Sequence, residues 1–463
     1  MDDSDRQTDS DQQTAGEHKR APAPKVKHGR MVDVPIAEME SATSRALRNA
    51  GAGPEAARRS ARELVANELD GASAHGLQRV AELVDAMASG DLDPHAEPRV
   101  ERTGSGSWRV HGGNCLPRDV ADHAARALIE GAGGGGMASV AVCSRNSLGR
   151  LASIAAPVAE EGLLVLGFAR SRRDSASVVA HGGRRGKLGS NPMVFAAPAG
   201  EPGADHGPVV VDVATSAASA GEVRSRVARD EPVPEGWLID RDGNPVHRGD
   251  GLDTEPPEAF LLPLGGRSQG HKGFGLALMV EILAGVLTGS RLMGSEPGGG
   301  HGSNGSPPEA DGVDEDPGQT DAGREPEECA FFVALSPRIA GRDEAAVRRD
   351  VESLTRYLED SGEGSRVEIP GWRARELRRD RLVEGSMALP TPLWTSVLRL
   401  AEPRAESEDL AAAEAPPATL TTARVVASRR RPRRPLTRPR SDVASPAPPG
   451  EVPETPPSEP PAD

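Results

Sequence analysis

A histidine and an arginine four residues apart, His75 and Arg79, are a first pair with catalytic potential. The surrounding apolar pattern places them at the start of a helix, where residues four apart project from one face. An imidazole titrates near neutral pH and can transfer a proton, and a guanidinium binds a carboxylate through two parallel hydrogen bonds. A helix-capping histidine beside a solvent-facing arginine is the plainer explanation, and the spacing alone favours it.

A second candidate region ends a strand predicted at Val209–Val213, a run of apolar β-branched residues. At that end, backbone N–H groups and the hydroxyls of Thr215 and Ser216 are donors that suit phosphate or ribose oxygens. An ordinary strand end fits the same residues equally well, so the letters alone do not assign a role.

A third candidate is the start of a strongly apolar helix predicted over residues 274–287, which His271 and Lys272 precede. The free N–H groups and the positive dipole end of a helix N-terminus attract anions, and a lysine adds charge there. A lysine that merely caps or solubilises the helix is the alternative. Because helix N-termini usually favour acidic side chains, the cation fits an anionic ligand better. The apolar residues surround this helix almost completely, which predicts that it is buried.

The common cofactor and metal motifs are missing from the sequence. The Gly133–Gly136 run precedes a strand, which is the wrong order for a phosphate-binding turn, and there is no Walker A or HExxH motif. Cys115, Cys143 and Cys329 are widely spaced and form no CxxC pair. We therefore expect neither a metal site nor a disulfide scaffold, which fits a reducing cytoplasm.

Composition and charge indicate a soluble protein with long polar segments. The 463 residues include 53 Gly and 41 Pro, only 2% are aromatic, and the formal charge of −15 argues against nucleic-acid binding. The N-terminus lacks the apolar core of a signal peptide, and residues 274–287 are too few to span a bilayer. We expect a cytoplasmic protein that does not enter membranes.

Three segments carry too little apolar surface to fold and are predicted to be disordered: residues 1–30, 295–328 and 403–463. The last contains an arginine-rich run between Arg429 and Arg440 that could bind nucleic acid or an acidic partner. A solvated tail interrupted by prolines is the favoured explanation.

Helices and strands are predicted between these segments. Apolar residues at helical spacing predict helices after Gly53, after Gly71, over residues 118–130, around Ile154, and over residues 343–358. Apolar runs predict strands at residues 137–143, 162–169, 193–197, 209–213 and 330–335. The elements alternate without a strict βαβ rhythm, so we expect an α/β protein with a mixed sheet and not a doubly wound one.

Six segments in order resemble the malate/L-lactate dehydrogenase-type family of NAD(P)-dependent oxidoreductases. They are GASAHGLQR at 71–79, LGSNPMVFAAP at 188–198, VVVDVATSAASAGEV at 209–223, PEGWLIDRDGNP at 234–245, HKGFGLALMVEILAGVLTG at 271–289 and IPGWRARELRRDRLVEGSMAL at 369–389. One segment alone would be weak evidence, whereas six in the family's order are strong. The similarity covers roughly residues 33–402.

The resemblance implies a mixed-sheet, non-Rossmann α/β fold and a homodimer. Residues 31–108 would form the helical N-terminal part of a first domain, and residues 109–232 an inserted cofactor-binding α/β domain. Residues 233–402 would complete the first domain, with the disordered insertion at 295–328. The tails 1–30 and 403–463 lie outside both.

The resemblance also implies roles for the candidate residues. Members reduce small 2-oxo acids or cyclic imino acids with NADH or NADPH, or run the reverse reaction. His75 matches the family's proton donor and Arg79 its arginine. Residues in two stretches match the dinucleotide-binding positions: Val211, Asp212, Val213, Ala214, Thr215, Ser216, Ala217, His271, Lys272 and Gly273. The turn at 369–371 is also near the cofactor in the family. Arg172 and Arg173 could accept a 2′-phosphate, but the choice between NAD and NADP stays open.

The sequence departs from the family pattern at several positions. Ala74 replaces a serine beside the catalytic histidine, Ser147 replaces a histidine that lines the active site, and Glu222 replaces a lysine. A glycine-rich turn also reads Asn-Cys-Leu-Pro at residues 114–117. Serine cannot titrate near neutral pH, so chemistry that needs a second imidazole is in doubt. Two interpretations remain: an active enzyme with His75 as the sole acid, which we favour, or an inactive dinucleotide-binding or interaction protein.

Overall fold

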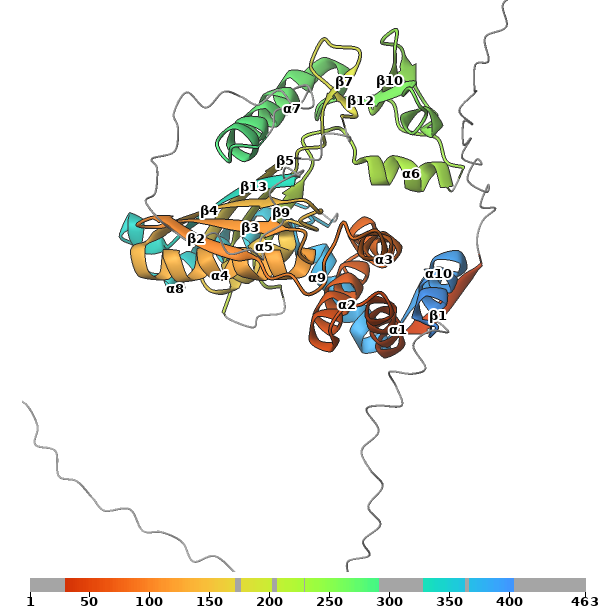
Figure 1. Ribbon diagram of the computed structural model, residues 1–463. Helices are drawn as coiled ribbons and strands as arrows, with labels where there is room; N and C mark the ends of the chain where they lie inside the picture. Colours follow the sequence, from red (N-terminus) through yellow and green to blue (C-terminus); the bar gives the residue numbers. More distant parts are fainter. Residues whose placement is uncertain are drawn as a thin grey trace, which may run out of the picture. The chain divides into compact units, whose positions relative to one another are not determined.

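The structure, a computed structural model, describes residues 30–170, 176–201, 206–228, 230–290, 328–362 and 366–403. Helices and mixed sheets make up this part of the chain (Figure 1), which confirms the predicted fold class. The segments predicted to be disordered lie almost wholly outside the described residues, as do Arg172, Arg173 and the arginine-rich run at 429–440. No helix among the described residues is long and apolar enough to cross a membrane.

A seven-stranded sheet forms the centre of the described chain, in the order β2-β3-β4-β13-β5-β8-β9. Its strands are β2 (Arg99–Gly104), β3 (Ser107–Gly113), β4 (Met137–Ser144), β13 (Glu328–Leu335), β5 (Leu164–Arg170), β8 (Met193–Ala197) and β9 (Val209–Val213). Only β3 and β4 pair in parallel, and every other neighbouring pair is antiparallel. The sheet is therefore mixed, as the irregular alternation of elements predicted.

Helices cover the two faces of this sheet. On one face, α4 (Pro117–Gly135) and α5 (Ala152–Glu160) bury Leu128 and Ile154 against Val140 and Val142 of β4. Burying one such side chain fully is worth about 1.5–3 kcal/mol. Because apolar residues alternate along β4, only one orientation of the strand turns them all toward the helices, and this energy selects it. On the other face, α7 (Gly266–Val280) packs through Val280 near Phe168 of β5 (Figure 1).

A second, helical region joins the two ends of the described chain. Strand β1 (Met31–Pro35) pairs antiparallel with β14 (Ser386–Pro390). Four helices share one core with them: α1 (Ile36–Asn49), α2 (Pro54–Leu69), α3 (Arg79–Ser89) and α10 (Thr391–Ala401). Met39 and Leu47 of α1 are buried in this core with Trp394 of α10. This packing supports a domain built from both ends of the chain, and its exact boundaries stay a prediction. Strand β13 belongs to residues 233–402, which were predicted to complete this first domain, but it lies within the central sheet.

The remaining elements surround the two regions. A five-stranded sheet has the order β11-β10-β12-β6-β7, with strands Pro245–Val246, Leu238–Asp240, Ala259–Leu261, Val178–Val179 and Gly186–Leu188. Short single turns are Ser73–His75, Asp250–Leu252 and Pro337–Ala340. The other helices are α6 (Ala220–Ala228), α8 (Glu344–Asp360) and α9 (Trp372–Glu384).

The prediction that the apolar helix is buried on all sides is wrong. Helix α7 begins at Gly266 and continues as a π-helical segment, Glu281–Val286. Four of its apolar side chains are about half exposed: Leu278 at 47%, Ile282 at 50%, Val286 at 54% and Leu287 at 56%. Val280 packs against the central sheet and Ala277 against the core of the five-stranded sheet, whereas the side that carries these four side chains is left uncovered by the described residues.

Helix α4 also runs past its predicted end. The apolar spacing predicts a helix over residues 118–130, yet α4 continues through Gly135 and is capped by Gly136, whose φ of 81° suits a left-handed terminus. Gly131 packs where a Cβ would lie 2.2 Å from the Trp108 ring. Close packing of this kind offsets the cost of about 1 kcal/mol that a glycine brings to a helix interior.

Candidate active site

His75 ends a single turn, Ser73–His75, that connects α2 to α3. The two candidate residues are therefore not on one regular helix, because α3 begins only at Arg79. They nevertheless line the same recess of about 30 Å³, together with Asn67, Arg118 and Gly149. The structure thus brings the predicted pair together through a turn followed by a helix start.

The buried carboxylate of Glu68 holds this turn in place. It accepts a hydrogen bond from the Ser73 hydroxyl at 2.6 Å and another from the Leu77 backbone N–H at 3.0 Å. Gly76 passes so close that a Cβ there would lie 2.2 Å from Glu68 Oε2. The amide of Asn67 adds a hydrogen bond to the His75 carbonyl at 3.1 Å. The glycine of the motif is thus required for packing beside a carboxylate.

The surroundings of His75 favour its neutral form. Desolvation by the surrounding protein, and then the positive charges of Arg79 and Arg150, lower the pKa of His75 from 6.5 to about 4. His75 is an exposed residue of the turn, and the two arginines flank its imidazole electrostatically. In the ligand-free chain at neutral pH, the imidazole is therefore poised to accept a proton.

Arg79 does not point freely into the recess. Its Nη1 atom lies 2.6 Å from Oε2 of Glu82, one turn further along α3. Glu82 is 60% exposed, so this ion pair is solvated and worth at most about 1 kcal/mol. A substrate carboxylate in the less exposed recess could therefore compete with Glu82 for the guanidinium.

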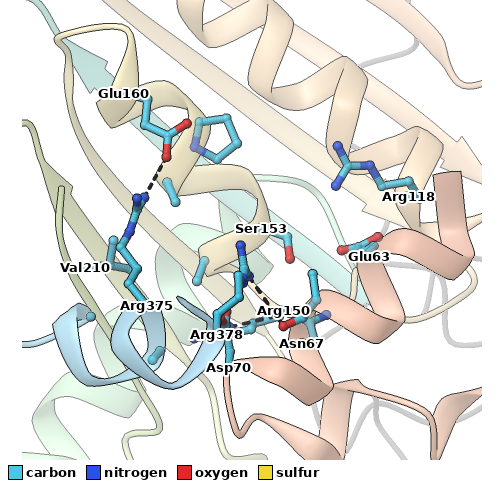
Figure 2. A pocket seen from close by; sticks show the side chains of 16 residues that line it. Glu63, Asn67, Asp70, Arg118, Arg150, Ser153, Glu160, Val210, Arg375 and Arg378 are labelled. Atoms are coloured by element: carbon cyan, nitrogen blue, oxygen red, sulfur yellow. Dashed lines mark hydrogen bonds and ion pairs between the residues drawn. The ribbon is translucent and has the colours of Figure 1, made fainter. Parts of the chain in front are cut away.

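A larger recess of about 230 Å³ lies beside the first and shares Glu63, Asn67 and Arg118 with it. Figure 2 shows that α2, α9 and the α4–α5 region each contribute charged side chains to it. Its four arginines are Arg118, Arg150, Arg375 and Arg378, and its three acids are Glu63, Asp70 and Glu160. Guanidinium groups clustered in a concave site are suited to phosphate and carboxylate ligands.

Asp70 is the hub of this second recess (Figure 2). One carboxylate oxygen, Oδ2, lies 2.7 Å from Nη1 of Arg150 and 2.7 Å from Nη2 of Arg378. The other oxygen, Oδ1, is buried without a hydrogen-bond partner, and so is Nε of Arg378. A buried polar atom without a partner is costly, so this cluster is incompletely satisfied by the contacts that it makes within the chain.

Glu63 lines both recesses, and Figure 2 shows it in the arginine-rich one. Burial raises its pKa above the usual range, although Arg118 and a hydrogen bond with Ser153 act against the shift. Carboxyl groups with raised pKa values in clefts often take part in proton transfer or ligand binding.

The sequence prediction missed most residues of the second recess. One signal was present: Glu63, Asn67 and Asp70 follow helical spacing and form a polar stripe on α2. Arg375 and Arg378 are likewise spaced to share one face of α9. Nothing in the sequence placed these two stripes opposite each other, because they are separated by about 300 residues.

The stretch at the end of β9 is occupied by internal contacts. Oδ2 of Asp212 accepts a hydrogen bond from the Ala152 N–H at 3.0 Å, at the start of α5, and lies 3.8 Å from Arg150. Burial raises the pKa of Asp212. The hydroxyl of Thr215 donates to the Ser190 carbonyl, and that of Ser216 to the Ala218 carbonyl.

The predicted cofactor contacts of this stretch therefore stay a prediction. Val211, Val213, Ala214 and Ala217 line neither recess, and the two hydroxyls already donate hydrogen bonds. The neighbouring Val210 is the residue of β9 that borders the arginine-rich recess.

His271 and Lys272 do not open their helix, which corrects the expected position. Helix α7 begins at Gly266, so Lys272 lies beyond the free N–H groups of the first turn. Both side chains are exposed, and His271 contacts His181 edge to face at 5.7 Å. Gly273 has a packing role, because a Cβ there would lie 2.3 Å from the Leu264 nitrogen.

Three of the positions that depart from the family pattern, Ala74, Ser147 and Glu222, lie in different surroundings. Ser147 accepts a hydrogen bond from the Gly149 N–H at 3.2 Å and so shapes the turn that leads to Arg150. Ala74 packs near Gly221 at the start of α6, 3.3 Å from the position of an added Cβ. Glu222 pairs with Arg226 on α6 at 3.2 Å. Among the described residues, no group of three His, Cys, Asp or Glu side chains is placed to hold a metal ion.

Comparison with known proteins adds a family match and named relatives. Residues 34–398 match the family model described as malate/L-lactate dehydrogenase. A Delta(1)-pyrroline-2-carboxylate/Delta(1)-piperideine-2-carboxylate reductase from Pseudomonas putida is 34% identical, over 57% of this chain and 73% of the relative. A malate dehydrogenase from Pyrococcus horikoshii is also 34% identical, over 56% and 69%. The fold is similar to that of malate dehydrogenase from Entamoeba histolytica, with a TM-score of 0.68, 24% identity, and coverage of 80% of this chain and 98% of that one.

Proposed function

Because the chain belongs to the malate/L-lactate dehydrogenase family, we propose that it is an NAD(P)-dependent oxidoreductase that interconverts a small 2-oxo acid, or a cyclic imino acid, with the corresponding 2-hydroxy or amino acid. The observation that carries this proposal is the convergence of His75 and Arg79 on one recess, beside a second recess with four arginines.

The arginine-rich recess is suited to the phosphates of a dinucleotide. Arg150, Arg375 and Arg378 would bind the anion through their guanidinium groups, which line this recess. When bound, the nicotinamide cofactor supplies or accepts the hydride. The choice between NAD and NADP is not part of the proposal, since Arg172 and Arg173 lie outside the described residues.

His75 would carry the proton. In the oxidation direction, its neutral imidazole takes the proton of the substrate hydroxyl, a state that its lowered pKa already favours. In the reduction direction, His75 must first be protonated. Anionic ligands near Arg79 and Arg150 would offset the positive charges that lower the His75 pKa, and so favour the protonated form.

Arg79 would bind the substrate carboxylate, exchanging its exposed partner Glu82 for the ligand. A planar guanidinium fixes a carboxylate through two hydrogen bonds and so orients the neighbouring carbonyl or imine carbon. Glu63, in the wall shared by both recesses, would take part in the same polar network.

The test is oxidation of NADH and NADPH by the purified full chain with a panel of 2-oxo acids and cyclic imino acids. We expect turnover with at least one substrate, and a loss of about 100- to 10,000-fold in His75→Ala. His95→Ala, an exposed histidine outside both recesses, is the matched control and should keep the rate. An unchanged rate in His75→Ala would refute the assigned role.

A second candidate function is dinucleotide binding without turnover. It is favoured by Ser147, which stands where the family has a titratable histidine. Calorimetry separates the two candidates: cofactor binding with no rate on any substrate would favour the second. A cytoplasmic location completes the proposal and can be tested by cell fractionation.

A further inference from the structure

Two cysteines that are 186 positions apart in sequence face each other on the central sheet. Cys143 of β4 and Cys329 of β13 are directly paired in the antiparallel register. Their sulfur atoms are 2.8 Å apart, with the Cys329 thiol donating to Cys143 Sγ. Both are free thiols in this structure, and their sequence spacing gave no sign of the pairing.

The backbone geometry of this pair suits a disulfide. Directly opposed residues of antiparallel strands have Cα atoms about 4.5–5.5 Å apart. A disulfide requires about 4.4–6.8 Å between the same atoms, and its sulfurs are about 2.05 Å apart. The bond can therefore form with a side-chain movement of less than about 1 Å and without breaking the strand pairing.

The two thiols differ in exposure and in acidity. Cys143 is partly exposed and Cys329 is buried. The hydrogen bond from Cys329, together with Thr288 and the charges of Arg109 and Arg170, lowers the pKa of Cys143 in spite of its burial. The same pairing and burial raise the pKa of Cys329. Because a thiolate is the reactive form, Cys143 is the nucleophile of the pair and Cys329 the resolving thiol.

We propose that Cys143 and Cys329 form a redox-active dithiol that closes to a cross-strand disulfide when the protein meets a peroxide. The Cys143 thiolate attacks one oxygen of hydrogen peroxide, giving a sulfenic acid as the O–O bond breaks and hydroxide leaves, which a proton converts to water. The Cys329 sulfur then attacks the sulfenic sulfur, the S–O bond breaks, and a second water leaves. Overall, two thiols and one peroxide give one disulfide and two waters.

The position of the pair connects it to the candidate active site. Ser144 follows Cys143 and ends β4, and the next residues form the loop that brings Gly149 and Arg150 to the two recesses. Glu328, the neighbour of Cys329, accepts a hydrogen bond from the Leu148 N–H in that loop at 3.2 Å. A covalent link at this point restrains both strands that support the loop.

The test begins with the reduced full chain, treated with hydrogen peroxide in small molar excess and then digested without reductant. We expect a linked peptide pair containing Cys143 and Cys329, a mass loss of two hydrogens, and a fall from three titratable thiols to one. Dithiothreitol should reverse all three changes. Stepwise addition of oxygen to Cys143 without a linked peptide, or a link to Cys115 or between chains, would overturn the proposal.

Matched variants exclude a general oxidation effect. Cys115→Ala should still form the link, whereas Cys143→Ala and Cys329→Ala should not. The thiol count of the wild-type chain does not depend on how well these variants fold.

Hydrogen exchange of residues 145–151 tests the connection to the loop: exchange should slow at least 2-fold on oxidation and recover on reduction. Unchanged exchange in cross-linked protein would overturn the restraint on the loop. None of these measurements requires turnover, so they stand apart from the test of the proposed activity.

Discussion

At the scale of single residues, the chemistry depends on the surroundings that His75 shares with two arginines. Arg79 and Arg150 lower its pKa, whereas they are also the cations that an acidic ligand would approach. Ligand charge and proton affinity are therefore coupled at one site.

The lowered pKa of His75 also makes the stability of the fold depend on pH. The unfolded chain protonates His75 near 6.5 and the folded chain only near 4, so the contribution of His75 to stability falls as pH drops through this window.

We predict that kcat/KM in the oxidation direction is lost only at low pH. Since the neutral imidazole is the active form, kcat/KM should stay level down to about pH 6 and fall only toward pH 4. Initial rates with a 2-hydroxy acid across this range measure the limb. Arg79→Gln should move the limb to higher pH by removing one positive charge. A limb near 6.5 that does not move in this variant would contradict the prediction.

Glu82 is predicted to compete with the substrate for Arg79. Glu82→Gln removes a solvated ion pair worth at most about 1 kcal/mol, so the KM for an acidic substrate should fall by up to about 5-fold with kcat little changed. Glu55→Gln is the control, since Glu55 is as exposed as Glu82 and pairs with Arg58 at the same spacing, outside both recesses. Steady-state kinetics measure both variants, and an unchanged or higher KM in Glu82→Gln would exclude competition.

At the scale of elements, the turn between α2 and α3 is set by what lies beneath it. Its shape follows from the buried Glu68 carboxylate and from the lack of a side chain at Gly76. The resemblance identified the motif that contains His75. The structure gives the physical reason for Gly76 in that motif, which is its close contact with Glu68 of α2. The catalytic candidate is thus positioned by a residue that touches no ligand.

Gly76→Ala is predicted to destabilise this turn. The new Cβ would meet Glu68 Oε2 at 2.2 Å, so the carboxylate must move and lose hydrogen bonds. We expect the free energy of unfolding to fall by about 1–3 kcal/mol in denaturant titrations, with a loss of activity. Gly134→Ala, within α4, is the control, because nothing lies within 4 Å of the added Cβ there. Equal stability of the two variants would contradict this account of the turn.

At the scale of the whole molecule, the arginine-rich recess exists because distant segments meet. Asp70, the residue directly after α2, pairs with Arg150, from the loop after β4, and with Arg378 of α9. The pairing of β1 with β14 brings the two ends of the described chain together in the same region. One carboxylate therefore holds together three parts of the chain and also reduces the positive charge offered to a ligand.

Asp70→Asn is predicted to change stability and binding in opposite directions. Loss of the shared carboxylate leaves two guanidinium groups without their partner, which should lower the free energy of unfolding by about 1–3 kcal/mol. The recess then gains positive charge, so the Kd for NAD(P) should fall. Denaturant unfolding and calorimetry measure the two effects. Asp253→Asn, which breaks an exposed pair with Arg224, should change neither appreciably, and weaker NAD(P) binding in Asp70→Asn would refute the electrostatic argument.

The uncovered side of α7 and its π-helical continuation is predicted to pack against a second copy of the chain. Its half-exposed apolar side chains form a face of the kind that protein interfaces bury. Ile282→Glu should convert a dimer to a monomer in sedimentation experiments, while Val383→Glu, on the 84% exposed Val383 of α9, should not. A wild-type chain that sediments as a monomer would rule out the homodimer.

The sequence by itself established the family, the mixed α/β fold class, most strands of the central sheet and the motif that contains His75 and Arg79. These features are local: alternation, helical spacing and short motifs are written in neighbouring residues. Strand β4 and helix α8, with its Asp343 cap, illustrate how well such signals locate an element. The sequence located the first residue of a helix less well. Lys272 was predicted to lie at a helix start, but α7 begins at Gly266, because glycines are poor indicators of a helix N-terminus.

Only the tertiary structure decided which distant residues meet. It placed Arg375 and Arg378 opposite Asp70, opposed Cys143 to Cys329, and gave the hydroxyls of Thr215 and Ser216 internal partners. These are contacts between residues far apart in sequence, or the outcome of competition between internal and external partners. Both depend on how strands and helices pack, which no local pattern encodes. The acidity of His75 belongs to the same class, since it follows from charges that the fold brings together.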